Sequence, residues 1–441
     1  RNIPQIPLSS LGRKPQSGFM IHQSVDNMED NRTPGFRRPW IATAWTVFVI
    51  AALLFLHFQV NWLNEVGNVQ PGIINLIKLG LVAITAIVWL CWLAIFSRLP
   101  RRFLATGLCL ALVALFFYRY RVIFDGDLGF VRIDSRFAGQ EFKPQILPAN
   151  AIIDISNTSS KDFNQFLGNQ RDAVVRDRML KADWAKNPPK LVWKQAVGAG
   201  WSGFSAVNGF AITQEQRGQN ECVTCYDIVS GKLMWIRSAA RRHEDTVSLG
   251  KVGPRATPTL DRGRVYTQGA TGVVDCLDGS TGDLIWSVDL NELLNIDLIE
   301  KTSSNGYQYA FEDSSLAWGR SGSPLVYEDL LIVPGGGPGN GPFTTLVALD
   351  ADTGEERWRG GTSQIAYGSP SVAKLLGRDQ IMLVAESAAI GFDPTSGQVL
   401  WTHERSGSSN SQANCSQATP VSNDRVLFSK GYALGGELVE L

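Results

Sequence analysis

Histidine and cysteine are scarce in this 441-residue chain, which has four histidines and six cysteines. The histidines are His22, His57, His243 and His403. None of them forms the close pair that zinc sites use, so the sequence predicts no metal site. The one close cysteine pair, Cys222 and Cys225, falls in an extended segment, where residues three apart face opposite sides. We therefore favour packing for this pair, with a metal or redox role as the weaker alternative.

An excess of either charge is also missing. Lys and Arg number 41, and Asp and Glu number 41. A nucleic-acid partner bound through bulk positive charge is therefore not expected. The glycine-rich run at residues 335–341 lacks a following Lys-Ser or Lys-Thr, so a hairpin loop explains it better than a phosphate loop does.

Three uncharged or nearly uncharged apolar runs lie within residues 39–121. They are Trp40–Val60, Ile73–Phe96 and Phe103–Tyr118. A helix needs about 20 residues to cross a bilayer, so we expect three transmembrane helices in contact with lipid. The third run is short and crosses only if flanking arginines extend toward water. A buried helical hairpin is less favoured because the runs lack a polar face.

Positive charge around these runs predicts their orientation. The tail 1–38 has six Lys or Arg residues, loop 97–102 has three, and loop 61–72 has none. The tail is therefore predicted to be cytoplasmic and the chain after residue 121 extracytoplasmic. Arg119 and Arg121 argue mildly against this. Residues 122–188 are expected to form an extracytoplasmic linker.

The polar part of the chain repeats the motif Asp-x-x-[Ser/Thr]-Gly-x-x-x-Trp four times. Its copies are Asp227, Gly231, Trp235; Asp278, Gly282, Trp286; Asp350, Gly354, Trp358; and Asp393, Gly397, Trp401. A degenerate copy ends at Trp193, and successive motif tryptophans lie 42, 51, 72 and 43 residues apart. The shortest intervals, near 42, match the length of a four-stranded propeller blade. One longer interval indicates an inserted loop at Asn291–Trp318. We interpret Asp and Gly as turn residues and Trp as a wedge between blades, rather than as a ligand-stacking ring.

A second repeat predicts where the inner strands begin. It recurs at Ala256–Pro258, Gly322–Pro324, Gly368–Pro370 and Ala418–Pro420. Proline suits the first residue of a strand, and inner strands line the axial channel. Residues beside these signals are the candidate ligand-binding set at the channel mouth: Glu215, Arg217, Arg255, Trp318, Arg320 and Tyr367. The alternative, which we favour slightly, is salt bridges between blades and solvated loops; no catalytic residue is apparent.

The two repeats together resemble the pyrroloquinoline-quinone-like β-propeller family over residues 189–441. The stretches Thr213–Gly218 and Gly253–Pro258 are similar to a membrane-anchored bacterial branch of it. The resemblance implies seven or eight blades, whereas this segment has room for about six. We therefore expect an all-β propeller of four-stranded blades, incomplete at its C-terminus by about two blades, after three transmembrane helices.

Two functions are compatible with this resemblance. The first is a binding scaffold in the bacterial inner membrane, with a periplasmic propeller whose face binds a protein partner. The second is a quinoprotein dehydrogenase that oxidises a sugar or an alcohol and passes electrons to membrane quinone. Only the second implies pyrroloquinoline quinone and calcium as cofactors. The scaffold is favoured, because no motif supplies the base or calcium ligands and no adjacent cysteine pair is present.

Overall fold

The computed structural model describes residues 39–59, 71–96, 102–124, 130–135, 153–175, 179, 181, 183–244, 252–303, 306–314, 316–405, 407, 413–431 and 434–441. The chain divides into two compact units, residues 1–139 and 140–441, and each is described by itself. The predicted tail 1–38 and most of the loops between the apolar runs lie outside the described residues.

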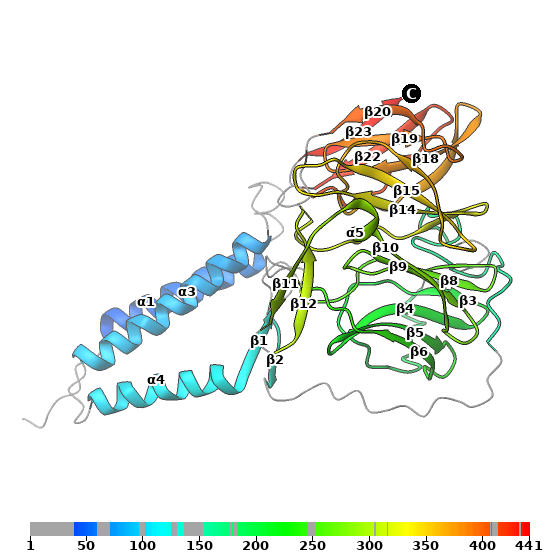
Figure 1. Cartoon of the computed structure of the whole chain (residues 1–441). Helices are drawn as coiled ribbons and strands as arrows, with labels where there is room; N and C mark the ends of the chain where they lie inside the picture. The colour runs from blue at the N-terminus through cyan, green and yellow to red at the C-terminus, as the bar shows by residue number, and fades with distance from the viewer. Residues whose placement is uncertain are drawn as a thin grey trace, which may run out of the picture. The chain divides into compact units, whose positions relative to one another are not determined.

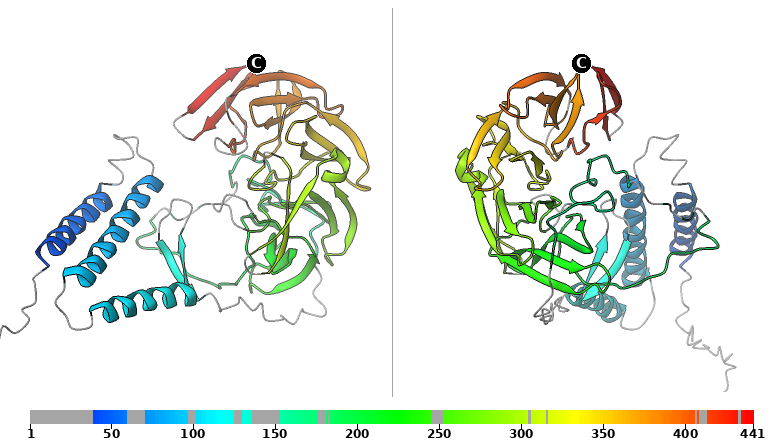
Figure 2. Two further views of the ribbon diagram at one scale, coloured as in Figure 1. Left: turned by 60° about the vertical axis from the view of Figure 1, so that its left-hand side comes forward. Right: turned by 90° about the vertical axis from the view of Figure 1, so that its right-hand side faces the viewer.

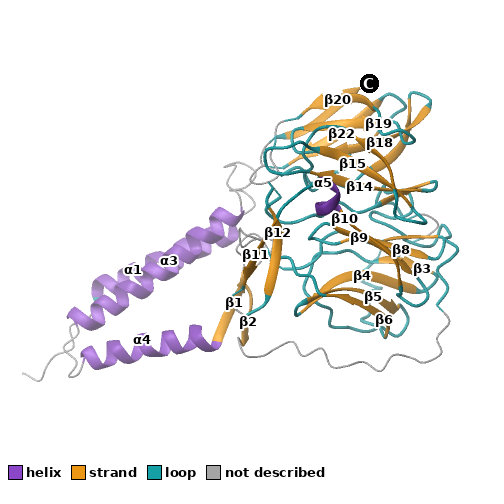
Figure 3. Ribbon diagram, viewed as in Figure 1, coloured by secondary structure: helices purple, strands orange, loops and turns teal. Residues whose placement is uncertain are grey.

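The first unit is built from apolar helices (Figure 3). They are α1 (Trp40–Phe58), α3 (Pro71–Cys91) with a π-helical extension η1 (Trp92–Phe96), and α4 (Arg102–Arg119). A two-stranded hairpin follows, made of β1 (Tyr120–Phe124) and β2 (Phe130–Ser135). Most apolar side chains of α1, α3 and α4 are exposed in the protein, as expected for helices that contact lipid.

Helices α1 and α3 are joined by two hydrogen bonds from indole to hydroxyl. Trp45 Nε1 donates to Thr85 Oγ1 over 3.0 Å, and Trp89 Nε1 donates to Thr46 Oγ1 over 2.9 Å. Each threonine hydroxyl also donates to a carbonyl one helical turn earlier. These bonds satisfy polar groups that lipid would leave unpaired, so α1 and α3 form a coherent pair.

Of the three predicted transmembrane helices, the structure supports two by their length. Among the described residues, two helices are long and apolar enough to cross a membrane, at Trp40–Phe58 and Ile73–Ile95. The third apolar segment, Phe103–Arg119, is helical but shorter. Its apolar run has charged residues close to both ends, and this limits the length of uninterrupted hydrocarbon-compatible helix.

The second unit contains antiparallel sheets in which consecutive strands are neighbours (Figure 1). The first is β3 (Ser205–Val207), β4 (Phe210–Arg217), β5 (Asn220–Asp227) and β6 (Leu233–Ala239); the second is β7 (Thr259–Asp261), β8 (Arg264–Gln268), β9 (Val273–Asp278) and β10 (Leu284–Asp289). The third is β13 (Leu325–Tyr327), β14 (Leu330–Gly336), β15 (Thr344–Asp350) and β16 (Glu356–Gly360); the fourth is β17 (Ser371–Leu375), β18 (Arg378–Val384), β19 (Ala388–Phe392) and β20 (Val399–Glu404). A fifth sheet has three strands, β21 (Thr419–Pro420), β22 (Arg425–Lys430) and β23 (Gly435–Glu440). Figure 2 shows these sheets following one another around an arc.

The estimate of about six blades is too high for the described residues, which form four four-stranded sheets and one three-stranded sheet. The estimate divided the length of residues 190–441 by a blade length of about 42 residues, and two segments of that range do not form blades. The first is the insertion, which forms α5 (Leu290–Leu294) and a hairpin of β11 (Leu298–Thr302) and β12 (Gln308–Glu312). The second is residues 190–204, where the one β contact is a bridge between Ala199 and Gln216.

The motif tryptophans make the same contact from sheet to sheet. Each indole N–H donates to the carbonyl that follows the motif aspartate of the next sheet. The bonds are Trp193 to Ile228 (2.8 Å), Trp235 to Gly279 (3.0 Å), Trp286 to Ala351 (3.1 Å) and Trp358 to Pro394 (3.2 Å). Trp401 differs, because its N–H donates to Gln380 Oε1 within its own sheet over 2.8 Å.

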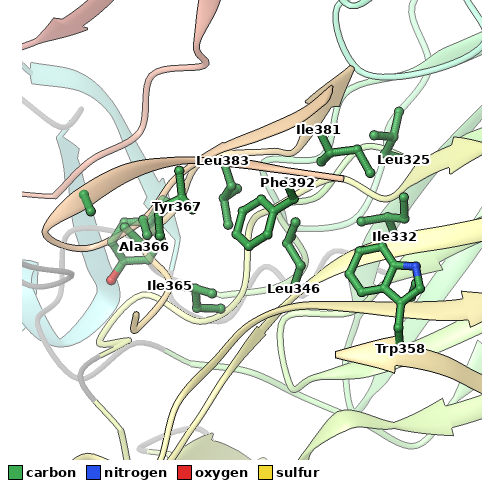
Figure 4. Packing of buried hydrophobic residues seen from close by; sticks show 14 of the residues in the cluster. Leu325, Ile332, Leu346, Trp358, Ile365, Ala366, Tyr367, Ile381, Leu383 and Phe392 are labelled. Atoms are coloured by element: carbon green, nitrogen blue, oxygen red, sulfur yellow. The ribbon is translucent and has the colours of Figure 1, made fainter. Parts of the chain in front are cut away.

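Apolar clusters fill the spaces between adjacent sheets. Figure 4 shows the cluster between the third and fourth sheets, where Trp358 packs with Ile332, Leu346 and Phe392. These side chains point inward from both sheets because successive residues of a strand alternate between its faces. The sheets are therefore joined by packed faces and by indole hydrogen bonds.

Candidate functional site

The second repeat forms hydrogen bonds from sheet to sheet at the start of the first strands. The backbone N–H of Thr257 donates to Ser323 Oγ over 2.9 Å, and that of Ser323 donates to Ser369 Oγ over 2.9 Å. Strand β7 contacts both β3 and β13, so the first strands converge toward the axis. These repeat residues therefore bond to one another in addition to lining the axis.

Residues 162–173, which we call the axial segment, lie along these first strands. Phe163 forms a β-bridge with Ala206 of β3. In the second sheet, the N–H of Leu260 donates to the carbonyl of Asn164 over 2.8 Å, and Asn164 Nδ2 donates to the Leu260 carbonyl over 3.0 Å. Part of the segment that the sequence treats as a linker thus packs onto the inner edge of the propeller.

Arg171 extends these contacts to the remaining sheets. Its guanidinium donates to the carbonyls of Ser323 (3.4 Å) and Pro324, just before β13, and to that of Pro370 (2.6 Å), just before β17. Gln417, before β21, donates to the Arg171 carbonyl over 3.3 Å. Burial lowers the pKa of Arg171 to about 9, so it stays cationic at neutral pH. The axial segment therefore contacts all five sheets at their inner edges.

The structure brings three of the six predicted mouth residues together. The rings of Trp318 and Tyr367 lie 5.3 Å apart, and the Trp318 backbone N–H donates to the Tyr367 hydroxyl over 3.4 Å. Burial raises the pKa of Tyr367, and the nearby positive charge of Arg255 opposes that rise. This cluster combines two aromatic rings with one cation.

His243 belongs to the same cluster, although it was not predicted from the sequence as a site residue. It is fully buried, and a Cβ on Gly319 would lie 2.7 Å from its Nε2. Burial, reinforced by the charge of Arg255, lowers the pKa of His243 to about 3, so its ring is neutral at physiological pH. A single histidine that is not spaced like a metal ligand carries no sequence pattern that would mark it as a site residue.

The other three predicted residues lie in two ion pairs. Arg217 pairs with Glu215 over 2.8 Å, and the Tyr226 hydroxyl donates to the same carboxylate over 2.9 Å. Arg320 pairs with Glu312 of β12, both side chains being almost completely buried. Arg320 also donates to the Pro334 carbonyl over 3.1 Å, so it fastens the insertion to the third sheet.

The described residues do not assemble a recognisable site for pyrroloquinoline quinone with calcium. Within this part of the chain, no group of three or more His, Cys, Asp or Glu residues is placed to hold a metal ion. The axial segment also occupies the inner edge where an axial ligand would contact several sheets. Cys222 and Cys225 are buried in β5, and burial raises the pKa of Cys225 to about 12, which opposes thiolate chemistry.

The insertion builds a cavity elsewhere on the second unit. The cavity has a volume of about 490 Å³ and lies between the hairpin β11–β12 and the ends of the first two sheets. Its lining includes Arg241 and Arg242 on the propeller and Leu298, Glu300 and Thr302 on β11. Both polar and apolar groups therefore face the same open cavity.

A family model described as outer membrane protein assembly factor BamB matches residues 219–438. This part of the chain belongs to the pyrroloquinoline-quinone-like β-propeller repeat family. No curated protein matches the chain.

Several solved structures of low sequence identity are similar to this propeller. Quinohemoprotein alcohol dehydrogenase from Comamonas testosteroni is 14% identical with a TM-score of 0.43, covering 61% of this chain and 46% of that chain. A europium-containing methanol dehydrogenase is 12% identical with a TM-score of 0.40, covering 57% of this chain and 51% of that chain. BamB from Moraxella catarrhalis is 16% identical with a TM-score of 0.22, covering 55% and 84%. The chain spans less than half of the Comamonas enzyme and 41% of the related Pseudomonas putida enzyme.

Proposed function

We propose that this chain is a membrane-anchored scaffold whose propeller binds another protein outside the cytoplasm. The observation that carries the proposal is the axial segment. Arg171 of this segment donates hydrogen bonds to carbonyls at the inner edge of the propeller, and its own carbonyl accepts one from Gln417. The sheet ends and outer surfaces then remain as the places where a partner can bind.

The membrane part of the proposal rests on α1 and α3. Both are long and apolar, and their exposed side chains suit lipid. The family adds a precedent for the scaffold role, because its model is described as an outer membrane protein assembly factor. That assembly role belongs to the described protein and comes to this chain only as part of the proposal.

A quinoprotein dehydrogenase is the alternative that the experiment must distinguish. The cluster of Arg255, Trp318 and Tyr367 is the one feature that favours it, since a cation beside aromatic rings suits a planar anion. The purified full-length chain in lipid nanodiscs is mixed with pyrroloquinoline quinone and calcium. Quinone absorbance retained after gel filtration, with sugar- or alcohol-dependent dye reduction, would overturn the scaffold proposal.

The positive arm of the experiment uses photo-crosslinking residues at Val229 and Leu376. Both are exposed, and they lie in turns at the same end of their sheets. A scaffold that uses this end should crosslink to the same identified protein from both positions in native membranes. If neither Val229 nor Leu376 crosslinks to a protein and the quinone is retained, the enzyme would replace the scaffold.

A further inference from the structure

Among the described residues, strand β11 pairs with one strand, and its other edge is open. In the hairpin, β11 pairs with β12 alone, in an antiparallel register that places Glu300 opposite Ala310. Strand β12 has a second neighbour, because the Ala310 N–H donates to the Arg242 carbonyl over 3.0 Å. The insertion is therefore fixed to the propeller through β12 and presents β11 outward.

The register shows which backbone groups of β11 are unpaired. The Ala310 N–H points away from β11, so Glu300 and Ala310 form a non-hydrogen-bonded pair. The N–H of Ser303 donates to the Tyr307 carbonyl over 2.8 Å, which puts Ser303 and Lys301 in the bonded set. The N–H and C=O groups of Leu298, Glu300 and Thr302 therefore point to the open edge. An open edge of this kind is a template for one more strand.

The same three residues line the 490 Å³ cavity, and the charges there are unequally paired. Arg241 pairs with Asp275 over 2.8 Å, and Arg242 pairs with Glu244 over 3.3 Å. Lys301 also borders the cavity, and its ammonium lies 4.9 Å from the centre of the Phe311 ring. In the described part of the chain, Glu300 has no ion-pair partner although its side chain borders the cavity. The cavity thus offers, among the described residues, a carboxylate outside any ion pair beside unpaired backbone groups.

We propose that the open edge of β11 binds an extended, lysine- or arginine-bearing segment of a partner protein as a third strand of the hairpin. The partner's backbone pairs with Leu298, Glu300 and Thr302, and its basic side chains enter the cavity and meet Glu300. Main-chain pairing favours a peptide over a small cation, because the alternating unpaired groups need a chain of matching spacing. This inference rests on the proposed scaffold function and names the chemistry of the partner.

The test uses the full-length chain in nanodiscs and two probes of about eight residues, one alternating Lys and Val and the other alternating Glu and Val. Hydrogen–deuterium exchange is resolved to single amides. The lysine peptide should slow exchange at Glu300 and Thr302, whose N–H groups face the edge, and leave the already bonded Lys301 unchanged. The glutamate peptide should slow neither.

Two variants and one control separate edge pairing from charge attraction. Thr302→Pro removes an outward N–H without removing a bond to β12, and should weaken the lysine peptide by about tenfold or more. Glu300→Lys should reverse the preference between the two peptides. Glu355→Gln, at an exposed carboxylate in the turn between β15 and β16 and outside the cavity, should bind the lysine peptide as the wild type does.

The failure of this inference differs from the failure of the scaffold proposal. If the lysine peptide slows no amide of β11, or if Glu300→Lys keeps the original preference, edge binding is overturned and the sheet ends remain as the scaffold surface. Retained quinone with substrate-dependent dye reduction overturns the scaffold proposal instead. If Thr302→Pro perturbs the hairpin itself, the Glu300→Lys preference still decides the result.

Discussion

At the scale of single residues, the motif glycine does more than allow a turn. Gly231, Gly282, Gly354 and Gly397 all have positive φ, between 70° and 79°. A Cβ on any of them would also lie 2.3 to 2.8 Å from the indole of the preceding tryptophan. The motif glycine of one sheet therefore packs directly against the motif tryptophan of the preceding sheet. A side chain at the glycine would push the two sheets apart.

Replacement of Gly282 by alanine is expected to destabilise the protein by about 2–4 kcal/mol. The left-handed backbone costs about 1–2 kcal/mol, and overpacking against Trp235 adds a similar amount. Urea denaturation followed by pulse proteolysis measures the change. Gly377→Ala is the matched control, because Gly377 has φ 80° and nothing within 4 Å of its Cβ position. Equal losses in the two variants would show that the indole contact contributes nothing.

The sequence predicts the periodic residues better than it predicts the ligand-site candidates. The tryptophans and glycines repeat with the blade, so their shared contact could be anticipated from spacing. Arg320 could not be placed, because its partner Glu312 lies in the insertion and has no counterpart in other repeats. Glu215 is likewise held by Arg217 and Tyr226, a pairing between adjacent strands that no motif encodes.

At the scale of elements, Arg171 should be essential for holding the axial segment in place. Arg171→Met would leave the carbonyls of Pro324 and Pro370 without their buried donor, and we expect a loss of about 3 kcal/mol or more. The urea midpoint and the protease sensitivity of residues 153–175 measure this loss. Arg425→Met is the control, because its ion pair with Glu440 is exposed and screened by solvent. An unchanged protease pattern in Arg171→Met would refute the role of the axial segment.

The contact between the first two sheets is expected to depend on pH through Glu221. This carboxyl is buried and accepts the Ala270 N–H over 3.3 Å. Burial raises its pKa from 4.5 to about 7; Arg241 and the Ala270 N–H oppose the rise, and Asp275 adds to it. Because the folded state binds the proton more tightly, this group's stabilisation is present below pH 4.5 and is lost as the pH rises through 7. The loss amounts to about 3 kcal/mol over that interval.

The variant Glu221→Gln should remove this pH dependence. Melting temperatures at pH 5 and pH 8 are compared for the wild type, Glu221→Gln and Glu355→Gln, the last an exposed control. Glu221→Gln should gain stability relative to the wild type at pH 8 and gain little at pH 5. Parallel curves for all three proteins would show that Glu221 does not titrate in this range.

Elements outside the repeat were the hardest to predict. The insertion at residues 291–318 could be located from one long interval between tryptophans, but its hairpin and cavity could not. The axial segment has no periodicity, and its contacts are single hydrogen bonds to backbone carbonyls that every residue possesses. Such contacts depend on where the chain returns in space, which neither spacing nor composition encodes.

At the scale of the whole molecule, the number of membrane crossings determines the side on which the propeller lies. Two crossings, α1 and α3, would place the propeller on the same side as the basic tail; a third crossing by α4 would place it opposite. Helix α4 has 18 residues, or about 27 Å, against about 30 Å of hydrocarbon. Arg102 and Arg119 at its ends can extend toward water and cover the difference, so we expect α4 to cross.

Cysteine labelling in intact spheroplasts tests this expectation. Val229→Cys is placed on an exposed turn, in a background where Cys91, Cys109 and Cys415 are serine, since Cys222, Cys225 and Cys276 are buried. An impermeant maleimide should label Val229→Cys before lysis and label Ser10→Cys, in the tail, only afterwards. Labelling of both positions only after lysis would mean that α1 and α3 alone cross. In that case the three arginines of loop 97–102 and the six basic residues of the tail would still be cytoplasmic, as the charge pattern requires, but α4 would not cross and the propeller would lie on the cytoplasmic side as well.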